Sequence, residues 1–186
     1  MSALGATIRS LLILAVLSAP VRSQELSKQP TTISFERFPS KVYEGPVKTP
    51  KGLHEDSDGT WRDELDKWVS EPTVNFAGEY YLTAHSCGTC CRYYSLNSLR
   101  TGRVFTSVSM FDAGDTPPRT KDGHTYVPIL FFKPNSRLLI VQYDLDPCSR
   151  AESNQCRQRY FVFEHGHFEA ISKTYASCTH EDEERK

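Results

Sequence analysis

Apolar and polar side chains alternate along residues 79–84, with Tyr80 and Leu82 on one face and Tyr81 and Thr83 on the other. This alternation is typical of a half-buried β-strand. A glycine within a cysteine-rich turn at residues 87–91 favours a sharp reversal into a second strand over residues 92–99. Gly102 favours another turn, which leads into a third strand over residues 103–108.

The second half of the chain repeats the strand and turn pattern. It predicts two hairpins, from strands at residues 126–133, 137–143, 159–164 and 168–171. Residues 138–141 are all apolar, which indicates a strand covered on both faces.

In residues 60–69 the apolar side chains recur with the period of a helix instead of that of a strand. Trp61, Leu65, Trp68 and Val69 recur at i, i+4, i+7 and i+8, behind a Thr60 and Asp63 pair that resembles a capping box. We therefore predict an amphipathic helix whose tryptophans pack on the core. The alternative is that the two tryptophans form a ligand platform.

These elements predict a mainly β fold of the α+β class, a meandering antiparallel sheet with one packed amphipathic helix. The hairpins at residues 96–104, 132–141 and 161–170 resemble those of β-propeller blades. A closed ring typically needs four or more four-stranded blades, and about seven strands are predicted here. We expect a proline-containing arm at residues 24–59, one domain at 60–178 and a charged tail at 179–186.

Residues 1–23 have the pattern of a secretory signal. Arg9 precedes an apolar run that ends near Ala19, and Ser23 completes a small-residue cleavage site. A run of about ten residues is too short for a bilayer, which takes about 20. We predict a periplasmic or secreted protein, cleaved after Ser23, that does not insert into a membrane after cleavage.

The charge is nearly balanced, with 22 basic and 23 acidic residues. Removing residues 1–23 removes two arginines and no acid, so the net charge falls to about −3. Without a basic stripe, the chain has little electrostatic drive towards nucleic acid or anionic membranes. No cofactor, metal or catalytic residue is assigned.

Six cysteines in an exported chain predict a disulfide framework. Three chemical roles compete with it. Cys87 and Cys90 have the spacing of a thiol oxidoreductase, but a strand follows them where a helix is usual. The same pair with His165 and His167 has zinc-ligand types at unusual spacing. A Cys-His hydrolase using His85, His165 or His167 lacks any local signature.

Several motifs resemble a family of small exported bacterial proteins that are mostly uncharacterised. They are Asn75-Phe76-Ala77-Gly78-x-Tyr80, Cys87-Gly88-Thr89-x-Cys91, Thr101-Gly102-x-Val104 and residues 136–141, followed by Cys148 and Cys156. The resemblance implies a bacterial, periplasmic setting and no particular activity. The chain departs from it by adding Cys90 and Cys178, and by His85 at an expected apolar or aromatic position.

Six cysteines allow fifteen full connectivities. Cys87 and Cys91, the pair shared with the family, flank one turn, while Cys148 and Cys156 flank a loop between expected neighbouring strands. The favoured pairing is therefore 87 with 91, 148 with 156, and Cys90 with Cys178.

Residues 109–123 form a polar loop longer than most connections, and such loops are either functional or disordered. We expect it to contact another periplasmic or incoming protein through Met110, Phe111, Asp112, Asp115, Arg119 and Lys121. The resulting hypothesis is a protein-binding module, an inhibitor or immunity protein acting on a cell-wall-degrading enzyme. The alternative is a thiol-disulfide redox protein using Cys87 and Cys90.

Overall fold

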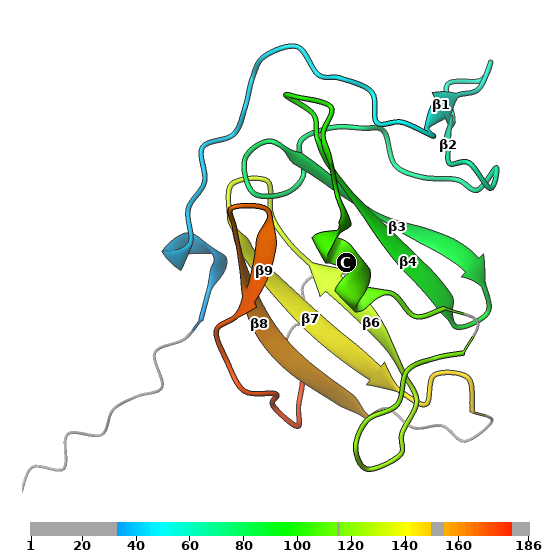
Figure 1. Ribbon diagram of the computed structural model, residues 1–186, viewed down its shortest axis with the longest axis vertical. Coiled ribbons are helices and arrows are strands. Elements are labelled where there is room, and N and C mark those ends of the chain that lie inside the picture. Colours follow the sequence, from blue (N-terminus) through cyan, green and yellow to red (C-terminus); the bar gives the residue numbers. More distant parts are fainter. Residues whose placement is uncertain (1–32, 115, 150–154, 180–186) are drawn as a thin grey trace, which may run out of the picture. The chain divides into compact units, whose positions relative to one another are not determined.

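The computed structural model describes residues 33–114, 116–149 and 155–179, which form strands and short 3₁₀ helices (Figure 1). In chain order the elements are η1 (Phe35–Arg37), β1 (His54–Glu55), β2 (Trp61–Arg62), β3 (Tyr80–Gly88), β4 (Cys91–Ser98), β5 (Val104–Phe105), η2 (Thr106–Phe111), β6 (Tyr126–Phe131), β7 (Leu138–Leu145), β8 (Cys156–Glu164) and β9 (His167–Ala170). The prediction of a mainly β, antiparallel fold with disulfides is confirmed.

The first large sheet has the order β3-β4-β5, and all of its pairs are antiparallel. Gly88 has a φ of 142°, which L-residues rarely adopt, and it opens the reversal between β3 and β4. The predicted third strand is much shorter than expected. It ends at Phe105, and the chain then forms the 3₁₀ helix η2.

The second large sheet is a four-stranded antiparallel meander, β6-β7-β8-β9. Residues Leu138 to Val141 of β7 are fully buried. Leu139 and Val141 belong to one hydrophobic cluster, whereas Leu138 and Ile140 belong to another. The prediction that this strand is covered on both faces is therefore confirmed.

One hydrophobic core joins the two large sheets. It takes Leu82 and Leu96 from the first sheet, Leu139 and Phe161 from the second, and Phe111 from η2. In Figure 1, η2 lies between the green strands and the yellow and orange strands. The two meanders share this core, and the likeness of their hairpins to propeller blades is not confirmed.

The predicted helix at residues 60–69 is wrong. Trp61 and Arg62 form β2, which pairs with β1, and the chain then turns tightly so that Arg62 bridges to Trp68. Asp66 has a φ of 59°, a left-handed conformation that a right-handed helix excludes.

The side chain of Asp63 explains this turn. Its Oδ1 accepts hydrogen bonds from the backbone N–H groups of Leu65 and Lys67, both at 2.9 Å. Aspartate commonly competes with helix formation in this way. As a result Trp68 is 71% exposed and Leu65 is 48% exposed, so their predicted core packing is also wrong, whereas Val69 is buried.

The first described residues of the arm lie against the second sheet. Phe35 of η1 packs with Leu138, Ile140 and Tyr160, and Ser136 donates a hydrogen bond from its hydroxyl to the Phe35 carbonyl. One compact unit begins at Ile33. The signal at residues 1–23 and the charged tail from 180 lie outside the described residues. The described residues contain no helix with the length and apolarity needed to span a bilayer.

All six cysteines form disulfides, and one of the three favoured pairs is confirmed. Cys87 is bonded to Cys91 across the β3–β4 turn. The other two favoured pairs, 148 with 156 and 90 with 178, are wrong, because the structure pairs Cys90 with Cys148 and Cys156 with Cys178.

Strand register explains the correction. Cys156 lies opposite Asp144 in the β7–β8 pair, so Cys148 has already left the ladder four residues further along. Beyond β9, Tyr175 bridges to Gln158 and lays the C-terminal segment beside β8. This brings Cys178 to Cys156, with a Cα separation of 5.8 Å.

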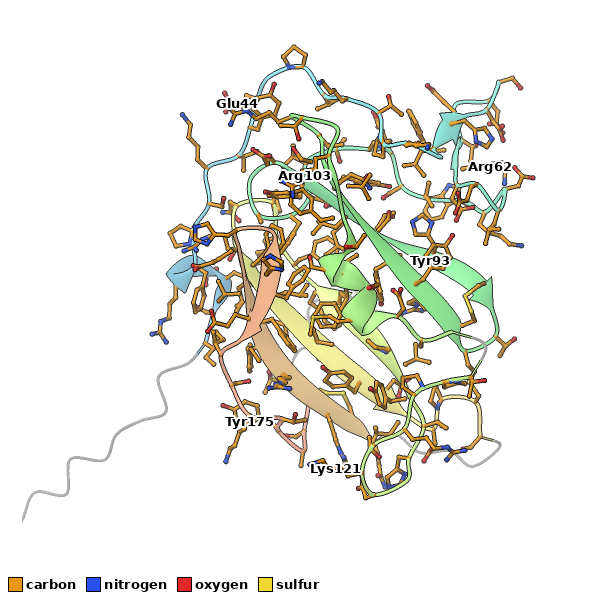
Figure 2. All side chains as sticks on the ribbon, in the orientation of Figure 1. Glu44, Arg62, Tyr93, Arg103, Lys121 and Tyr175 are labelled. Atoms are coloured by element: carbon orange, nitrogen blue, oxygen red, sulfur yellow. A yellow bond between two sulfur atoms is a disulfide. The ribbon has the colours of Figure 1, made fainter. Side chains whose placement is uncertain are left out.

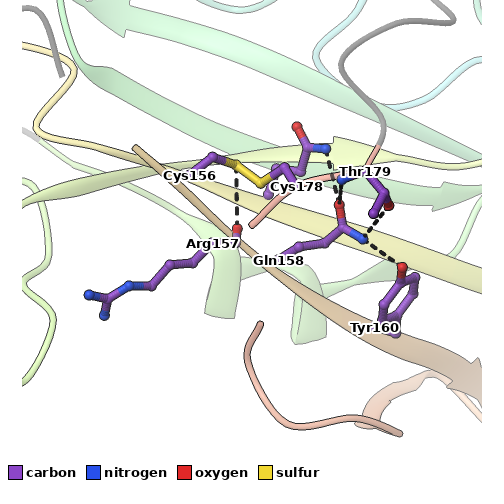
Figure 3. Close-up of a disulfide and its surroundings, with 7 residues drawn as sticks. Cys156, Arg157, Gln158, Tyr160, Cys178 and Thr179 are labelled. Carbon is purple, nitrogen blue, oxygen red and sulfur yellow. Dashed lines mark hydrogen bonds between the residues drawn. A yellow bond between two sulfur atoms is a disulfide. The ribbon is translucent and has the colours of Figure 1, made fainter. Parts of the chain in front are cut away.

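Gln158 completes that attachment (Figure 3). Its Nε2 donates to the Tyr160 hydroxyl at 2.6 Å and to the Thr179 hydroxyl at 3.1 Å, and its Oε1 accepts from the Thr179 backbone N–H. Gln158 is 1% exposed. A buried amide requires such partners, so the end of the described chain is fixed by hydrogen bonds as well as by a disulfide.

Candidate functional site

The predicted contact loop at residues 109–123 begins within η2, and two of its residues, Phe111 and Ala113, are buried in the core. Phe111 is 1% exposed, and its ring makes edge contacts with Phe161 and Phe168, so it is not an exposed anchor. Met110 is 57% exposed. Of Met110 and Phe111, only Met110 is available for the predicted contact.

The polar residues of that loop differ from one another in their exposure and in their contacts. Asp112 accepts a hydrogen bond from the Tyr94 backbone N–H at 2.9 Å, and burial raises the pKa of its carboxyl. Arg119 donates to the Gly123 carbonyl at 2.8 Å. Lys121 is exposed (Figure 2), and Asp115 lies outside the described residues. The structure does not gather these side chains at one site.

A different group of polar residues converges on the outer face of the first sheet. Along β4, Tyr94 and Leu96 enter the core, so Tyr93, Ser95 and Asn97 point to the opposite face. The antiparallel register places His85 of β3 directly opposite Tyr93. His85 and Ser95 are therefore diagonal neighbours on one face of the sheet.

Asp63 reaches this face from the turn after β2. Its Oδ2 lies 2.7 Å from His85 Nδ1, and His85 Nε2 lies 2.9 Å from the hydroxyl oxygen of Ser95. The ring of Tyr93 stacks on the imidazole with centroids 4.5 Å apart and planes 10° apart. We call Asp63, His85 and Ser95 the His85 triad.

The triad is sheltered by the segment that carries Asp63. Asp63 is 1% exposed and His85 is 5% exposed, while Ser95 is half-buried. The Tyr81 hydroxyl, on the same face as His85, donates to the Ser70 carbonyl at 2.6 Å. These hydrogen bonds hold residues 61–70 over the sheet, and Figure 2 shows Tyr93 of β4 on the side towards Arg62 of β2.

Opposing effects set the charge of Asp63. Burial raises its pKa, but hydrogen bonds from His85 and from the backbone N–H groups of Lys67 and Leu65 outweigh burial. The net result is a pKa below its usual value, so the carboxylate is ionised at neutral pH.

A pocket of about 90 Å³ opens beside the triad. It is lined by His85, Tyr93, Ser95 and Asn97 from the sheet, and by Gly52 and Glu64 among the covering residues. The Tyr93 hydroxyl is buried and has no hydrogen-bond partner among the described residues. Buried polar groups nearly always have partners, so this unpaired hydroxyl is an unusual feature of the pocket wall.

A larger groove of about 780 Å³ lies elsewhere, between the arm, the 77–80 turn and the β8–β9 hairpin. Four of its charged side chains form two pairs, because Arg100 lies 3.7 Å from Glu79 and Arg137 contacts Glu164. The groove therefore presents no unmatched charge from these pairs to a ligand. Its size alone is in the range of ligand sites.

An exposed apolar pair on the turn at residues 63–68 completes the set of candidates. Trp68 and Leu65 stand on the segment that the His85 triad fixes. We call this segment the tryptophan turn. Large exposed side chains on a fixed backbone are typical of protein contact sites.

Sequence reasoning found His85 but not its partners. The alternation of Tyr93, Ser95 and Asn97, with the reversal at Gly88, was a signal that could have placed Ser95 beside His85. Asp63 could not be found in this way, because the spacing of the apolar residues around it indicated a helix.

No protein-family model, curated protein or solved structure matches the chain. The resemblance to small exported bacterial proteins thus stays a prediction.

Proposed function

We propose that the protein is an exported protein-binding module whose contact site is the tryptophan turn. The observation that carries the proposal is the 71% exposure of Trp68 on a backbone that hydrogen bonds hold in place. Tryptophan is among the residues that contribute most to protein interfaces, because its large rigid ring loses little conformational entropy on binding.

The turn is preorganised by its own hydrogen bonds. Val69 N–H donates to the Trp61 carbonyl and Asp63 N–H donates to the Lys67 carbonyl, both at 2.9 Å. The buried side chain of Asp63 then ties the turn to His85 of the sheet. A contact site that is already ordered pays little entropy on association, which favours affinity.

The compartment supports the class of partner. Three disulfides are typical of proteins that fold in an oxidising environment outside the cytoplasm. Together with the resemblance to exported bacterial proteins, this favours a periplasmic or incoming partner. We propose a cell-wall-degrading enzyme, which the protein inhibits or against which it protects as an immunity protein.

The redox alternative lacks its dithiol. Cys87 is bonded to Cys91 and Cys90 to Cys148, so the two cysteines of the C-x-x-C spacing do not form one reversible couple. We therefore do not propose thiol-disulfide exchange at this pair.

A comparison of two exposed apolar side chains tests the binding proposal. The mature oxidised protein is used as bait against periplasmic extract and purified peptidoglycan-cleaving enzymes, with binding measured by pull-down and inhibition by clearing of cell-wall suspensions. We expect Trp68→Ala to weaken binding by at least 2 kcal/mol, roughly a 30-fold change in Kd.

Met110→Ala is the matched control, since Met110 is 57% exposed and belongs to the loop first predicted to make the contact. It should bind as the wild type does. If Met110→Ala loses binding and Trp68→Ala keeps it, the loop is the contact site and the tryptophan turn is not.

A further inference from the structure

The three side chains of the His85 triad are hydrogen-bonded in a defined order, from Asp63 through His85 to Ser95. The carboxylate of Asp63 is on Nδ1 of the imidazole, and the hydroxyl of Ser95 is on Nε2. This is the order in which a nucleophilic serine, a general base and an orienting carboxylate are assembled in serine hydrolases. We propose that the His85 triad is a hydrolytic site for short-chain esters, with Ser95 as nucleophile.

The ionised carboxylate determines which imidazole nitrogen carries the proton. Asp63 can only accept, so Nδ1 of a neutral His85 must donate to it, and Nε2 is left with its lone pair. Nε2 then accepts the proton of the Ser95 hydroxyl. His85 is thus held as the general base, and Asp63 is a positioning residue that acts through it.

Asp63 and His85 are sufficient to attach the tryptophan turn to the sheet, and Ser95 is not needed for this attachment. Asp63 Oδ1 already binds two backbone N–H groups of the turn, and Oδ2 binds the sheet through His85. Ser95 adds nothing to that attachment, because it belongs to the same sheet as His85. Its half-buried hydroxyl instead lines the pocket, where an ester carbonyl could reach it.

The pocket limits the size of the acyl group. Its volume of about 90 Å³ is small beside the roughly 300 to 1,000 Å³ of typical ligand sites, which suits an acetyl-sized group. Tyr93 also lines the pocket, and we assign its hydroxyl, which has no partner among the described residues, as the donor to the oxyanion. Burial is the main cause of its raised pKa, so the phenol keeps the proton that it would donate.

The reaction needs only ester and water. Ser95 Oγ adds to the carbonyl carbon while its proton passes to His85 Nε2, and the tetrahedral adduct then expels the alcohol, which takes that proton. Water attacks the acyl ester of Ser95 and transfers a proton to Nε2. Collapse releases the carboxylic acid and returns the proton to Ser95.

Labelling with a biotinylated fluorophosphonate tests the nucleophile directly. The full mature protein, with its disulfides intact, is incubated with the probe, and the adduct is located by peptide mass spectrometry. We expect modification at Ser95 in the wild type and in Ser86→Ala, a control that removes an exposed serine next to His85, and none in Ser95→Ala. An unmodified Ser95 in the wild type overturns the proposal, and this result does not depend on whether a variant folds.

Hydrolysis of 4-nitrophenyl acetate tests the roles of the neighbours in folded variants. Asp63→Asn should lower kcat by about 10³- to 10⁴-fold with little change in KM, because the wrong imidazole tautomer is then favoured. Tyr93→Phe keeps the stacked ring and should lower kcat by about 10²-fold. Wild-type hydrolysis no faster than that of Ser95→Ala would contradict the proposal.

Discussion

At the scale of single residues, the polar face of the first sheet depends on satisfied hydrogen bonds. A buried imidazole or carboxylate without partners destabilises a protein by several kcal/mol. His85 has a partner at each ring nitrogen, and Asp63 has three donors. The polar residues at this position are compatible with burial only as a connected group, so changing one affects the others.

The lowered pKa of Asp63 predicts how stability depends on pH. Its folded value lies below the usual 3.8, so its contribution is fully present above about pH 4 and is lost as pH falls through the folded value. We expect Asp63→Asn to lower the free energy of unfolding by about 1 to 3 kcal/mol at pH 7, with the difference shrinking below pH 4. Urea unfolding at a series of pH values measures it.

Asp66→Asn is the control for that series. Asp66 lies on the same turn, with a side chain that is 81% exposed, and asparagine tolerates its left-handed backbone. Its difference from the wild type should stay within about 0.5 kcal/mol throughout. A difference for Asp63→Asn that persists unchanged at pH 2 would mean that the charge of Asp63 is not what stabilises the turn.

At the scale of elements, the sequence predicted the strands because their signal is local. Local strand and turn patterns placed β3, β4, β6 and β8 near their observed positions, and the apolar row placed β7 in the interior. The helix failed because one side chain, Asp63, binds the backbone of its own turn more effectively than the helical period indicates. Periodicity does not detect such side-chain competition.

The cysteine pairing and the His85 triad required register, which the sequence did not provide. From the sequence alone, Cys148 and Cys156 are expected to form a disulfide because they flank one loop. The strand register argues against this pair, because it places Cys156 opposite Asp144 and not opposite Cys148. The partners of His85 come from β4 and from a turn more than 20 residues earlier in the chain. Contacts between distant segments depend on tertiary structure, and for that reason sequence patterns found only one member of the triad.

The length of the loop that each disulfide closes predicts how strongly that disulfide stabilises the fold. The bonds span 58 residues for Cys90 with Cys148, 22 for Cys156 with Cys178 and 4 for Cys87 with Cys91. The chain-entropy model gives about 4, 3 and 2 kcal/mol respectively. Paired Cys→Ser variants, unfolded in guanidinium chloride, should lose stability in this order.

The pair 87 and 91 serves as the internal reference for this series, because its short loop restricts the unfolded chain least. Equal losses for all three pairs would show that loop closure does not determine the ranking. A larger loss for the 156 and 178 pair than for the 90 and 148 pair would point to the hydrogen bonds of Gln158, which depend on the attached C-terminal segment.

At the scale of the whole molecule, two of the disulfides reinforce connections that the shared core and hydrogen bonds also make. Cys90 with Cys148 joins the tip of the first sheet to the end of β7 in the second. Cys156 with Cys178 joins the C-terminal segment to β8. A reducing compartment would remove all of these links at once, so folding and export are expected to be coupled.

The intact mass of protein recovered from the periplasm or medium tests this coupling. We expect a chain that begins at Gln24, after cleavage behind Ser23, and that is lighter than its fully reduced form by two hydrogen atoms for each disulfide. Alkylation without prior reduction should add no mass, because every cysteine is paired. Recovery of a chain that retains Met1, or that takes up alkylating agent before reduction, would contradict export through a cleaved signal or the three-disulfide fold. The two contrary results are distinguishable, since the first changes the N-terminus and the second changes only the thiol count.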